Sequence, residues 1–518
     1  MSKWSAGYVS ELDYVFSYIE ELNTNRVNFC LLNKGIQSPK ISQALELGFG
    51  QGISINIHAA ASDVAWYGTD FNPGQTNFAR NLAIESGVEA HLYDDSFEQL
   101  LSNRDLPEFQ FIALHGIWSW ISDKNREVIV DIIRTKLAVG GVVYLSYNTY
   151  PGWSSFSPMR HLMTQHSRVL GNNGEGLARR ISNAFEFGER LIELNPSYLR
   201  ANSNVKARIR AMKAQNSHYL AHEFFNQDWH PMYFSEVAEV LCEAKLEFAG
   251  SAEFADQVDE INFTAEQREF ITEAADPIFR ESVKDFMLNR QFRRDYWVKG
   301  PLRLDPFERA TKLRKVQVVL KTAPHEITFK MQGGVGEVSL NPSRYQPIIN
   351  YLSDQKIKSI GEIEAHCATE NKDSTPIIKL AEIVQSVTLL LSTGQLALAQ
   401  PEEVISKARK TTRALNETLL DKAKSGRDMG IVASPVTASG VTANRIEQLF
   451  LIAINDGASE PHLWAETAWA VLSSQGQKLI VNEVMLDSDE ANLNELIEKA
   501  INFEQKRLTT FRALGVIC

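Results

Sequence analysis

The segment that decides the fold joins a short apolar run to a helical pattern, and it reads Ala44-Leu45-Glu46-Leu47-Gly48-Phe49-Gly50-Gln51-Gly52. Glycines at a strand-to-helix turn let a ligand approach the backbone, and the first helical turn offers it unpaired N–H groups. Asp70 ends the next apolar run, 18 residues after Gly52. A carboxylate at that position can accept hydrogen bonds from two ribose hydroxyls. The segment therefore predicts a nucleoside-binding turn after the first strand of an α/β sheet.

Short apolar runs alternate with helical patterns around this turn, as far as about residue 150. The runs that we predict to be strands are Ile41–Leu47, Val64–Thr69, Ala90–Tyr93, Phe109–Leu114 and Val142–Tyr147. Apolar residues at helical spacing predict helices between Leu12 and Leu22, over Ile53–Ala60 and over Ser122–Leu137. Strands that alternate with helices form a parallel, doubly wound sheet, so we predict an α/β fold.

The chain length of 518 residues exceeds what one hydrophobic core supports, and a prior of ~150 residues per domain suggests about three domains. We predict a nucleoside-binding domain over 1–256, in which a helical insertion at about 155–226 interrupts the sheet pattern. A mostly helical middle domain is expected over 257–335. The C-terminal domain, over 336–518, mixes helices with a loop-like stretch at Ser425–Val441.

The bulk composition excludes several classes of protein. Hydrophobic residues make up 44% and charged residues 23% of the chain, as is usual for globular proteins in solution. The net charge of −11 repels polyanions, so we expect no nucleic-acid partner. The N-terminal residues form no apolar signal segment, and no run approaches the ~18 apolar residues of a membrane span. The four cysteines are far apart and form no CxxC pair, which favours a reducing compartment. We expect a cytoplasmic protein.

Two further groups of residues, a pair of histidines and a basic stretch, give weaker indications of function. His218 and His222 stand at helical spacing with Glu223 after them, but in the zinc motif HExxH the glutamate lies between the histidines. We therefore predict no metal site. The basic stretch from Arg290 to Lys315 also contains acidic residues, and we interpret it as a solvated helix face.

The acidic residue inside the glycine motif decides between two ligands. The pyrophosphate of NAD(H) needs closely approaching N–H donors and gains nothing from a nearby carboxylate. S-adenosylmethionine has no phosphate, and its sulfonium is a cation that Glu46 can support through the loop. We therefore favour S-adenosylmethionine, with NAD(P) as the alternative ligand and a turn with incidental glycines as the structural alternative.

The strand ends that follow add contacts for the same ligand. The segment Asp94-Asp95-Ser96-Phe97 follows the third strand; Asp95 is placed to accept from the adenine amine, and Phe97 to pack on the ring. The fourth strand leads into Leu114-His115-Gly116-Ile117-Trp118-Ser119-Trp120 on the cofactor edge. Each tryptophan either packs in the core or lines a methyl-transfer channel.

An aromatic and polar turn, Tyr147-Asn148-Thr149-Tyr150-Pro151-Gly152-Trp153, follows the fifth strand. Neutral oxygens and aromatic faces suit an amine that approaches a sulfonium. We therefore place the methyl acceptor beside this turn.

Four blocks of this sequence resemble the bacterial class I methyltransferases that carry a methyltransferase regulatory domain. They are residues 45–52, 66–73, 114–122 and 146–153, and the stretch 288–295 resembles the regulatory domain itself. The best-understood members are the rickettsial-type lysine methyltransferases that modify outer-membrane proteins. The resemblance covers almost the whole chain and is strongest over 1–160 and 255–300.

The resemblance implies a Rossmann-like donor domain with a helical dimerisation insertion, a helical middle domain and a winged-helix-like C-terminal domain. It implies a homodimer that binds S-adenosylmethionine and a lysine-bearing protein. The donor contacts that we predict are Glu46, Gly48, Gly50, Gly52, Asp70, Phe71, Asp95, Ser96, His115 and Gly116. The residues expected around the acceptor are Trp118, Asn148 and Tyr150.

Three functions are compatible with these residues. The favoured one is a protein-lysine N-methyltransferase. The second is a methyltransferase for small molecules, for example in surface-polysaccharide or secondary metabolism. The third is a regulatory protein whose donor pocket is catalytically idle, which the complete set of glycines and acids disfavours.

Overall fold

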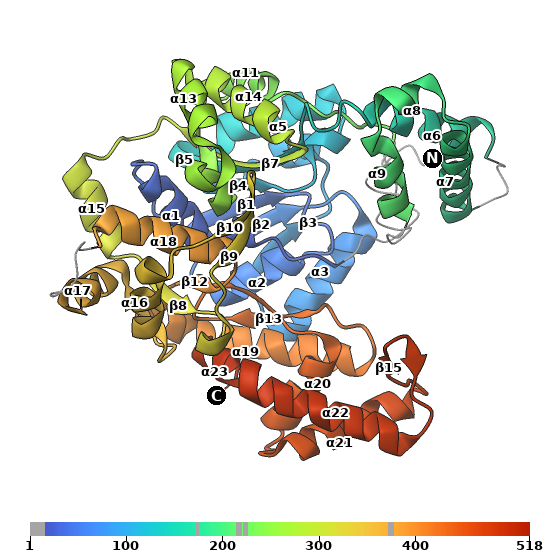
Figure 1. The fold of residues 1–518 in the computed structure, drawn as a ribbon, viewed down its shortest axis with the longest axis vertical. Coiled ribbons are helices and arrows are strands. Elements are labelled where there is room, and N and C mark those ends of the chain that lie inside the picture. The colour runs from blue at the N-terminus through green and yellow to red at the C-terminus, as the bar shows by residue number, and fades with distance from the viewer. Residues whose placement is uncertain (1–15, 172–175, 214–219, 221–225, 371–377, 518) are drawn as a thin grey trace.

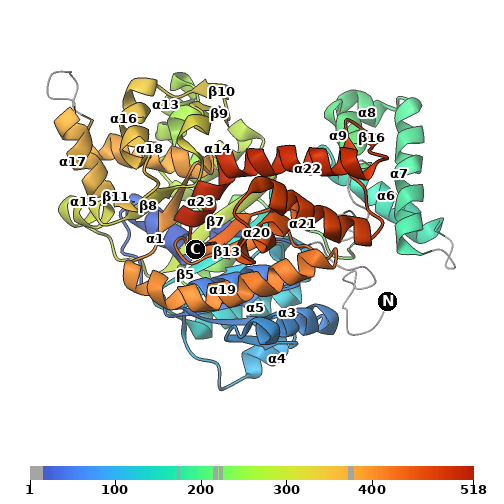
Figure 2. The same cartoon turned by 90° about the horizontal axis from the view of Figure 1, so that it is seen from below.

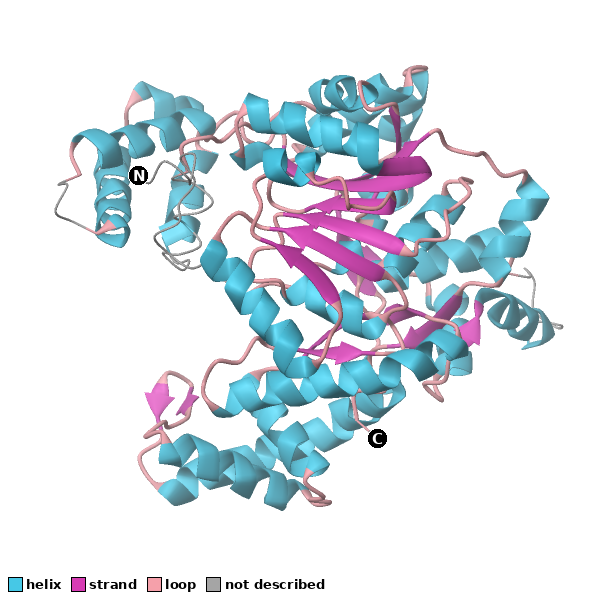
Figure 3. Ribbon diagram, turned by 180° about the vertical axis from the view of Figure 1, so that it is seen from behind, coloured by secondary structure: helices cyan, strands magenta, loops and turns pink. Residues whose placement is uncertain are grey.

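The computed structural model describes residues 16–171, 176–213, 220, 226–370 and 378–517. Within these residues, its central element is a seven-stranded sheet in the order β3-β2-β1-β4-β5-β7-β6 (Figures 1 and 3). Strands β1 to β5 are parallel, and β7 runs antiparallel to both of its neighbours, β5 and β6. The strands are β1 Gln43–Leu47, β2 Ala65–Thr69, β3 Ala90–Tyr93, β4 Phe109–Leu114, β5 Leu137–Asn148, β6 Leu246–Ser251 and β7 Phe292–Lys299. The predicted Rossmann-like α/β class is confirmed.

Helices cover both faces of the sheet because successive strand residues point to opposite sides. In β1, Ala44 packs into one hydrophobic cluster, whereas Leu45 and Leu47 pack into another on the opposite face. The helices α1 Thr24–Asn33, α2 Ile53–Ala61 and α3 Pro73–Ser86 contribute to the first cluster. Those that contribute to the second are α4 Phe97–Ser102, α5 Asp123–Lys136 and α11 Phe234–Cys242.

The chain start differs from the predicted opening helix. Residues 1–15 lie outside the described residues, so only the end of that prediction can be compared. There, Glu20–Leu22 forms a single 3₁₀ turn, η2, whose Leu22 is buried. Its neighbour Asn23 caps α1 through a hydrogen bond from the Asn25 N–H.

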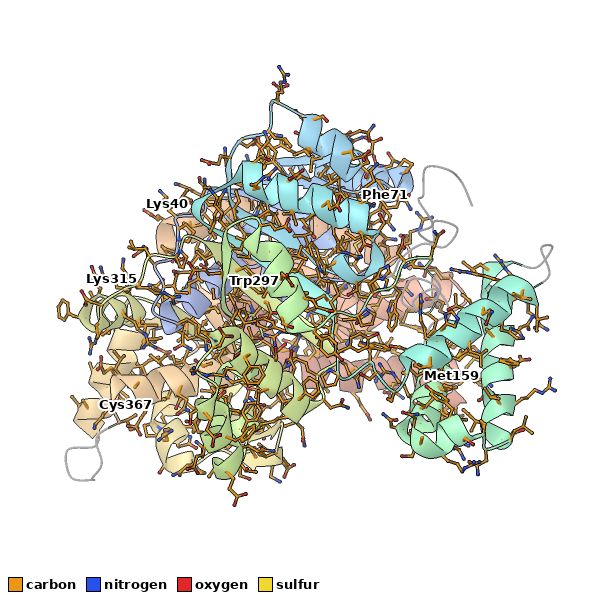
Figure 4. All side chains as sticks on the ribbon, turned by 90° about the horizontal axis from the view of Figure 1, so that it is seen from above. Lys40, Phe71, Met159, Trp297, Lys315 and Cys367 are labelled. Carbon is orange, nitrogen blue, oxygen red and sulfur yellow. The ribbon has the colours of Figure 1, made fainter. Side chains whose placement is uncertain are left out.

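The predicted helical insertion projects from one side of the molecule (Figures 1 and 4). It contains α6 Ser157–Val169, α7 Leu177–Glu193, α8 Ser197–Ala201 and α9 Asn204–Lys213, which share their own hydrophobic cluster. Met159, marked in Figure 4, lies in that cluster, well apart from Trp297 in the main body. His218 and His222 lie outside the described residues. The homodimer implied for this insertion stays a prediction.

Residues 257–335 contain more than the helices that we expected from the sequence. The helices are α12 Asp259–Asn262, α13 Ala265–Glu273, α14 Pro277–Leu288 and α15 Pro306–Arg314. Besides β7, the region contains the strands β8 Gln317–Leu320 and β9 Lys330–Gly333, and β9 forms a hairpin with β10 Gly336–Ser339 just beyond it. Strand β7 lies between β5 and β6 and completes the main sheet. We therefore propose that the donor domain extends to Lys299 instead of ending at residue 256.

The interpretation of the basic stretch as a solvated helix face was wrong for its first part, which forms the buried strand β7. The last part does form a helix with a largely exposed surface, α15. Arg293 in β7 is 3% exposed, and its guanidinium contacts three carboxylates. It donates to Asp285 at 2.7 Å and to Asp295 at 2.8 Å, with Glu281 at 3.0 Å. A buried arginine is tolerated only when carboxylates compensate its charge, and those partners come from α14 and from β7 itself. A solvated helix would not have needed them.

The C-terminal part packs against α2 and α3, the helices next to the glycine turn (Figure 2). Its elements are α16 Pro342–Leu352, β11 Lys358–Ser359, α17 Ile360–Glu370, α18 Leu380–Ser392, β12 Leu396–Ala399, α19 Glu402–Lys424, β13 Ile431–Ser434, β14 Ser439–Thr442, α20 Arg445–Asn455, α21 Pro461–Ser474, β15 Ile480–Val481, β16 Val484–Met485, α22 Asp489–Phe503 and α23 Thr509–Ala513. The stretch expected to be loop-like contains the hairpin β13–β14. Among the described helices, none is long and apolar enough to cross a bilayer.

Candidate active site

The glycine turn after β1 has the backbone that only glycine adopts without strain. Gly48, Gly50 and Gly52 have φ of +76°, +59° and +71°. A Cβ at Gly48 would lie 2.3 Å from Ile117 Cδ1, and one at Gly52 would lie 2.5 Å from Ala79 Cβ. Gly52 is also the N-cap of α2. The turn therefore presents bare backbone, and the helix N-terminus behind it offers free N–H groups.

Asp70, which follows β2, holds this turn in place. Its carboxylate accepts from the Gly50 N–H at 2.8 Å and from the Asn72 N–H at 2.9 Å. The side chain is 7% exposed, and burial raises its pKa to about 7 although both hydrogen bonds favour the charged form. Asp70 thus links the glycine turn on β1 to the end of the adjacent strand.

Glu46 of β1 is a buried carboxyl group with an unsatisfied oxygen. The residue is 4% exposed, and its Oε2 has no hydrogen-bond partner among the described residues. Burial, followed by the negative charge of Asp70, raises the pKa of Glu46 to about 8. An unpartnered buried carboxyl group is costly unless a ligand supplies a cation or a hydrogen-bond donor. The site therefore has the chemistry to bind a cationic group.

One cavity of about 440 Å³ opens over the glycine turn, a size suited to a small-molecule ligand. All ten residues predicted to contact the donor line this cavity: Glu46, Gly48, Gly50, Gly52, Asp70, Phe71, Asp95, Ser96, His115 and Gly116. Phe71 lies on the side of the body from which the insertion projects (Figure 4). Phe97, expected against the adenine, lines the cavity as well, whereas Asp94 pairs with Arg80 at 3.1 Å.

His115 lines the cavity as a neutral imidazole. Its Nδ1 lies 2.8 Å from the Tyr144 hydroxyl, and burial lowers its pKa to about 4. The next residue, Gly116, donates its N–H to Ser146 Oγ at 2.9 Å. These bonds tie the end of β4 to β5. A neutral histidine adds no positive charge where a cationic ligand would bind.

Comparisons with known proteins agree with this geometry. The family model described as "Predicted methyltransferase regulatory domain" matches residues 216–299. An uncharacterised protein of Synechocystis sp. is 38% identical over 99% of both chains. An uncharacterised protein of Rickettsia prowazekii is 24% identical over 56% of this chain and 52% of its own length. The structure of PKMT2 from Rickettsia typhi in complex with AdoHcy shares the fold with a TM-score of 0.70 and 14% identity, over 96% of this chain and 99% of that one.

The chain belongs to the class I methyltransferases that carry a methyltransferase regulatory domain. The sheet order β3-β2-β1-β4-β5-β7-β6, with β7 antiparallel, is the architecture of this methyltransferase fold. The regulatory-domain match begins in the last part of the insertion and ends with β7. It therefore spans β6 and β7, the strands that complete the sheet.

In this methyltransferase, the three residues expected around the acceptor lie outside the cavity lining. Trp118 is fully buried in the cluster between the sheet and α5. Asn148 is 4% exposed, and its N–H donates to Ser119 Oγ. The Tyr150 ring packs against Tyr233 with a centroid distance of 5.2 Å. An acceptor role for them stays a prediction that this geometry does not support.

Other residues of the methyltransferase occupy the wall beyond the donor contacts. Trp120, Asn125, Asn226 and Asp228 line the cavity there. Trp120 stands two residues after Trp118, and the sequence offered no means to tell which of the two faces the cavity. Asn226 ends the insertion, Asp228 follows it, and neither belongs to a motif by which its role could be predicted.

The pH dependence of stability tests the two buried carboxyl groups of the ligand-free methyltransferase. Their pKa values are higher in the folded than in the unfolded chain, so the folded protein binds more protons between about pH 4 and pH 8. The free energy of unfolding is therefore greatest at the acidic end of this window, and this contribution is lost as the pH rises through about 8. In the Glu46→Gln variant, the free energy of unfolding is expected to fall less as the pH rises.

Urea unfolding at a series of pH values from 5 to about 9 measures the effect, expected to be of the order of a few kcal/mol for Glu46. Glu89→Gln, at an exposed position in the loop between α3 and β3, is the control and should show the same pH dependence of unfolding as the parent protein. Parallel pH profiles for Glu46→Gln and the parent would contradict this description of Glu46.

Proposed function

We propose that this methyltransferase binds S-adenosylmethionine over the glycine turn and methylates the side-chain amine of a lysine in a protein. One observation carries the proposal: two buried carboxyl groups, Glu46 and Asp70, line a cavity whose floor is bare glycine backbone. The fold shared with PKMT2 from Rickettsia typhi supports the same assignment.

The residues present fit the donor. Gly50 has open space where a Cβ would stand, which lets a ligand approach the backbone there. The orphaned Glu46 oxygen suits a ligand with cationic and N–H donor groups. When bound, the donor would supply a methyl group activated by a sulfonium: an uncharged amine nitrogen bonds to the methyl carbon in line as the carbon–sulfur bond breaks, and the sulfur leaves as a neutral thioether. Asp70 would accept from the ribose hydroxyls, and Asp95 from the adenine amine.

The chain's own residues then have to hold the acceptor amine uncharged and aligned. A free lysine has a pKa of ~10.4, so removal of its proton at pH 7 costs about 4–5 kcal/mol. Burial beside a cation lowers that pKa, and the proton can leave to water before the cavity closes around the amine. Neutral His115 adds no further charge. Alignment of the reacting atoms supplies much of the remaining acceleration.

Trp120 and Asp228 are the residues that we assign to the acceptor side. The Asp228 carboxylate, at the cavity wall, can attract the lysine ammonium as it enters. The largely buried Trp120 side chain lines the same cavity, and an aromatic face turned to a cation stabilises it by ~0.5–2 kcal/mol. Asp228 Oδ1 also lies 3.5 Å from His230 Nε2.

Substitution of Asp70 tests the donor site. Asp70→Ala should weaken S-adenosylmethionine binding by more than about tenfold, because it removes the ribose acceptor and the bond that holds Gly50. Isothermal titration calorimetry measures the affinity, and circular dichroism checks the fold. Asp94→Ala, which removes an aspartate outside the cavity, should bind the donor normally. Equal affinities of the parent and Asp70→Ala would remove Asp70 from the donor site.

Substitution of Asp228 tests the acceptor side. Asp228→Asn should raise KM for a lysine-bearing protein or peptide about three- to tenfold while donor affinity stays unchanged, because it removes one attractive charge. Radiolabelled methyl transfer measures the rates. Asp131→Asn, at a surface ion pair on α5, is the matched control. A loss of donor affinity, or no change in KM, would place the acceptor elsewhere.

A further inference from the structure

Part of the wall of the donor cavity comes from a segment that precedes the first helix of the sheet domain. We call this segment, Ser17–Asn23, the strap. Ser17 and Ile19 line the same cavity as the glycine turn. The Ile19 N–H donates to Ser54 Oγ at 2.8 Å, and Ser54, in the first turn of α2, lines the cavity as well. The strap therefore lies against the helix that begins at the glycine turn.

The two ends of the strap are held differently. Toward α1, the Tyr296 hydroxyl of β7 donates to the Glu21 carbonyl at 2.6 Å, and Leu22 is buried. At the cavity, residues 16–19 belong to neither a helix nor a strand, and Ser17 is exposed. A segment outside regular secondary structure shifts at a lower cost than a strand or a helix does. The position of the cavity end therefore depends on side chains that reach it from other elements.

The C-terminal hairpin β13–β14 lies beside the strap and packs against α2 (Figure 1). Residues 431–441, which include the turn between its strands, are all buried. In the turn, the Thr437 and Ser439 hydroxyls share a hydrogen bond of 2.7 Å. Ala438 has a φ of +53°, which residues with a Cβ adopt rarely and which persists where the surroundings fix the backbone. The turn therefore presents its carbonyls in set directions.

Asn23 joins the end of the strap to this turn. Its side chain is buried, and Nδ2 donates to the carbonyls of Thr437 at 2.8 Å and of Ala438 at 3.3 Å. Its Oδ1 accepts from the Asn25 N–H and caps α1. One amide thus performs two separable tasks: its oxygen caps a helix, and its nitrogen bonds the C-terminal hairpin.

His58 of α2 lies between the hairpin and the cavity end of the strap. Nδ1 is 3.1 Å from the Ala438 carbonyl oxygen, and Nε2 is 3.4 Å from the Ile19 carbonyl oxygen. Burial lowers the pKa of His58 to about 4, so the ring is neutral at pH 7 and carries one N–H. It can donate to one of the two carbonyls at a time. The bond that could hold the cavity end of the strap is therefore shared with the hairpin.

We propose that the strap closes one side of the donor cavity and that the C-terminal hairpin, through Asn23 and His58, keeps it in place. Asn23 and His58 lie outside the cavity lining, so they are positioning residues that act through Ser17 and Ile19. A loosened strap would speed donor release while the groups that contact the donor stay unchanged. The C-terminal part would thereby set how long the donor remains bound. This inference rests on the proposed binding of S-adenosylmethionine.

The release rate of S-adenosylhomocysteine from the full chain tests the strap. Asn23→Ser keeps a side-chain oxygen that can cap α1 but removes the amide that bonds the hairpin. Release should become about three- to tenfold faster, because the wall of the cavity is held less firmly. Surface plasmon resonance on immobilised protein measures the rate. Asn341→Ser is the matched control, since Asn341 is an exposed N-cap residue of α16 and lies outside the cavity lining.

Hydrogen–deuterium exchange gives a second measurement that needs no variant. In the parent protein, saturating S-adenosylhomocysteine should slow the exchange of residues 17–19, whose Ile19 N–H is bonded to Ser54. In Asn23→Ser, the same residues should exchange faster than in the parent, whereas α1 should exchange at the parent's rate. A variant that had merely lost stability would show faster exchange in α1 as well.

The outcomes separate the strap from the donor assignment. Faster release from Asn23→Ser, with faster exchange confined to the strap, supports the inference. A parent that binds S-adenosylhomocysteine but shows unchanged exchange at residues 17–19, or a variant that releases it at the parent's rate, overturns the strap and leaves the donor site standing. No binding to the parent in calorimetry overturns the donor assignment and the strap with it.

Discussion

Two buried carboxyl groups on adjacent parallel strands are the constraint on which the site depends. Glu46 and Asp70 face one cavity, and the charge of Asp70 raises the cost of ionising Glu46. Two hydrogen bonds satisfy Asp70, but an oxygen of Glu46 has none within the described residues. Two carboxyl groups buried side by side cost free energy in the empty site. A cationic ligand would compensate that cost, so the arrangement is typical of a binding site.

The rest of the chain keeps this pair in place. The C-terminal part holds the helix that follows the glycine turn: Gln400 donates to the Ala61 carbonyl at 2.7 Å, and Thr411 donates to that of Ala60. Toward the other edge of the sheet, β7 pairs with β5 along its length, and the buried Arg293 of β7 forms an ion pair with Asp295. Residues of the body and Asn226 at the end of the insertion line the same cavity, so segments that are distant in the sequence contribute to one site.

The residues that line the cavity at the glycine turn could be predicted from the sequence, because they lie at the ends of strands that the sequence pattern identifies. Three glycines, Glu46 and Asp70 stand at strand ends, and parallel strands bring their carboxyl ends to one edge. Strand β7 could not be predicted, since its charged residues imitate a solvated helix until Asp285 and Asp295 are known to compensate Arg293. The rest of the cavity wall depends on long-range packing, which brings Trp120 to the cavity and Trp118 into the core.

A crystal structure of the protein with S-adenosylhomocysteine tests the central claim most directly. The account predicts that the nucleoside lies over Gly48–Gly52, with the ribose hydroxyls at Asp70 and the amino-acid tail beside the turn that Glu46 supports. A nucleoside bound away from this turn, or a cavity that accepts NAD(H) in its place, would contradict the account.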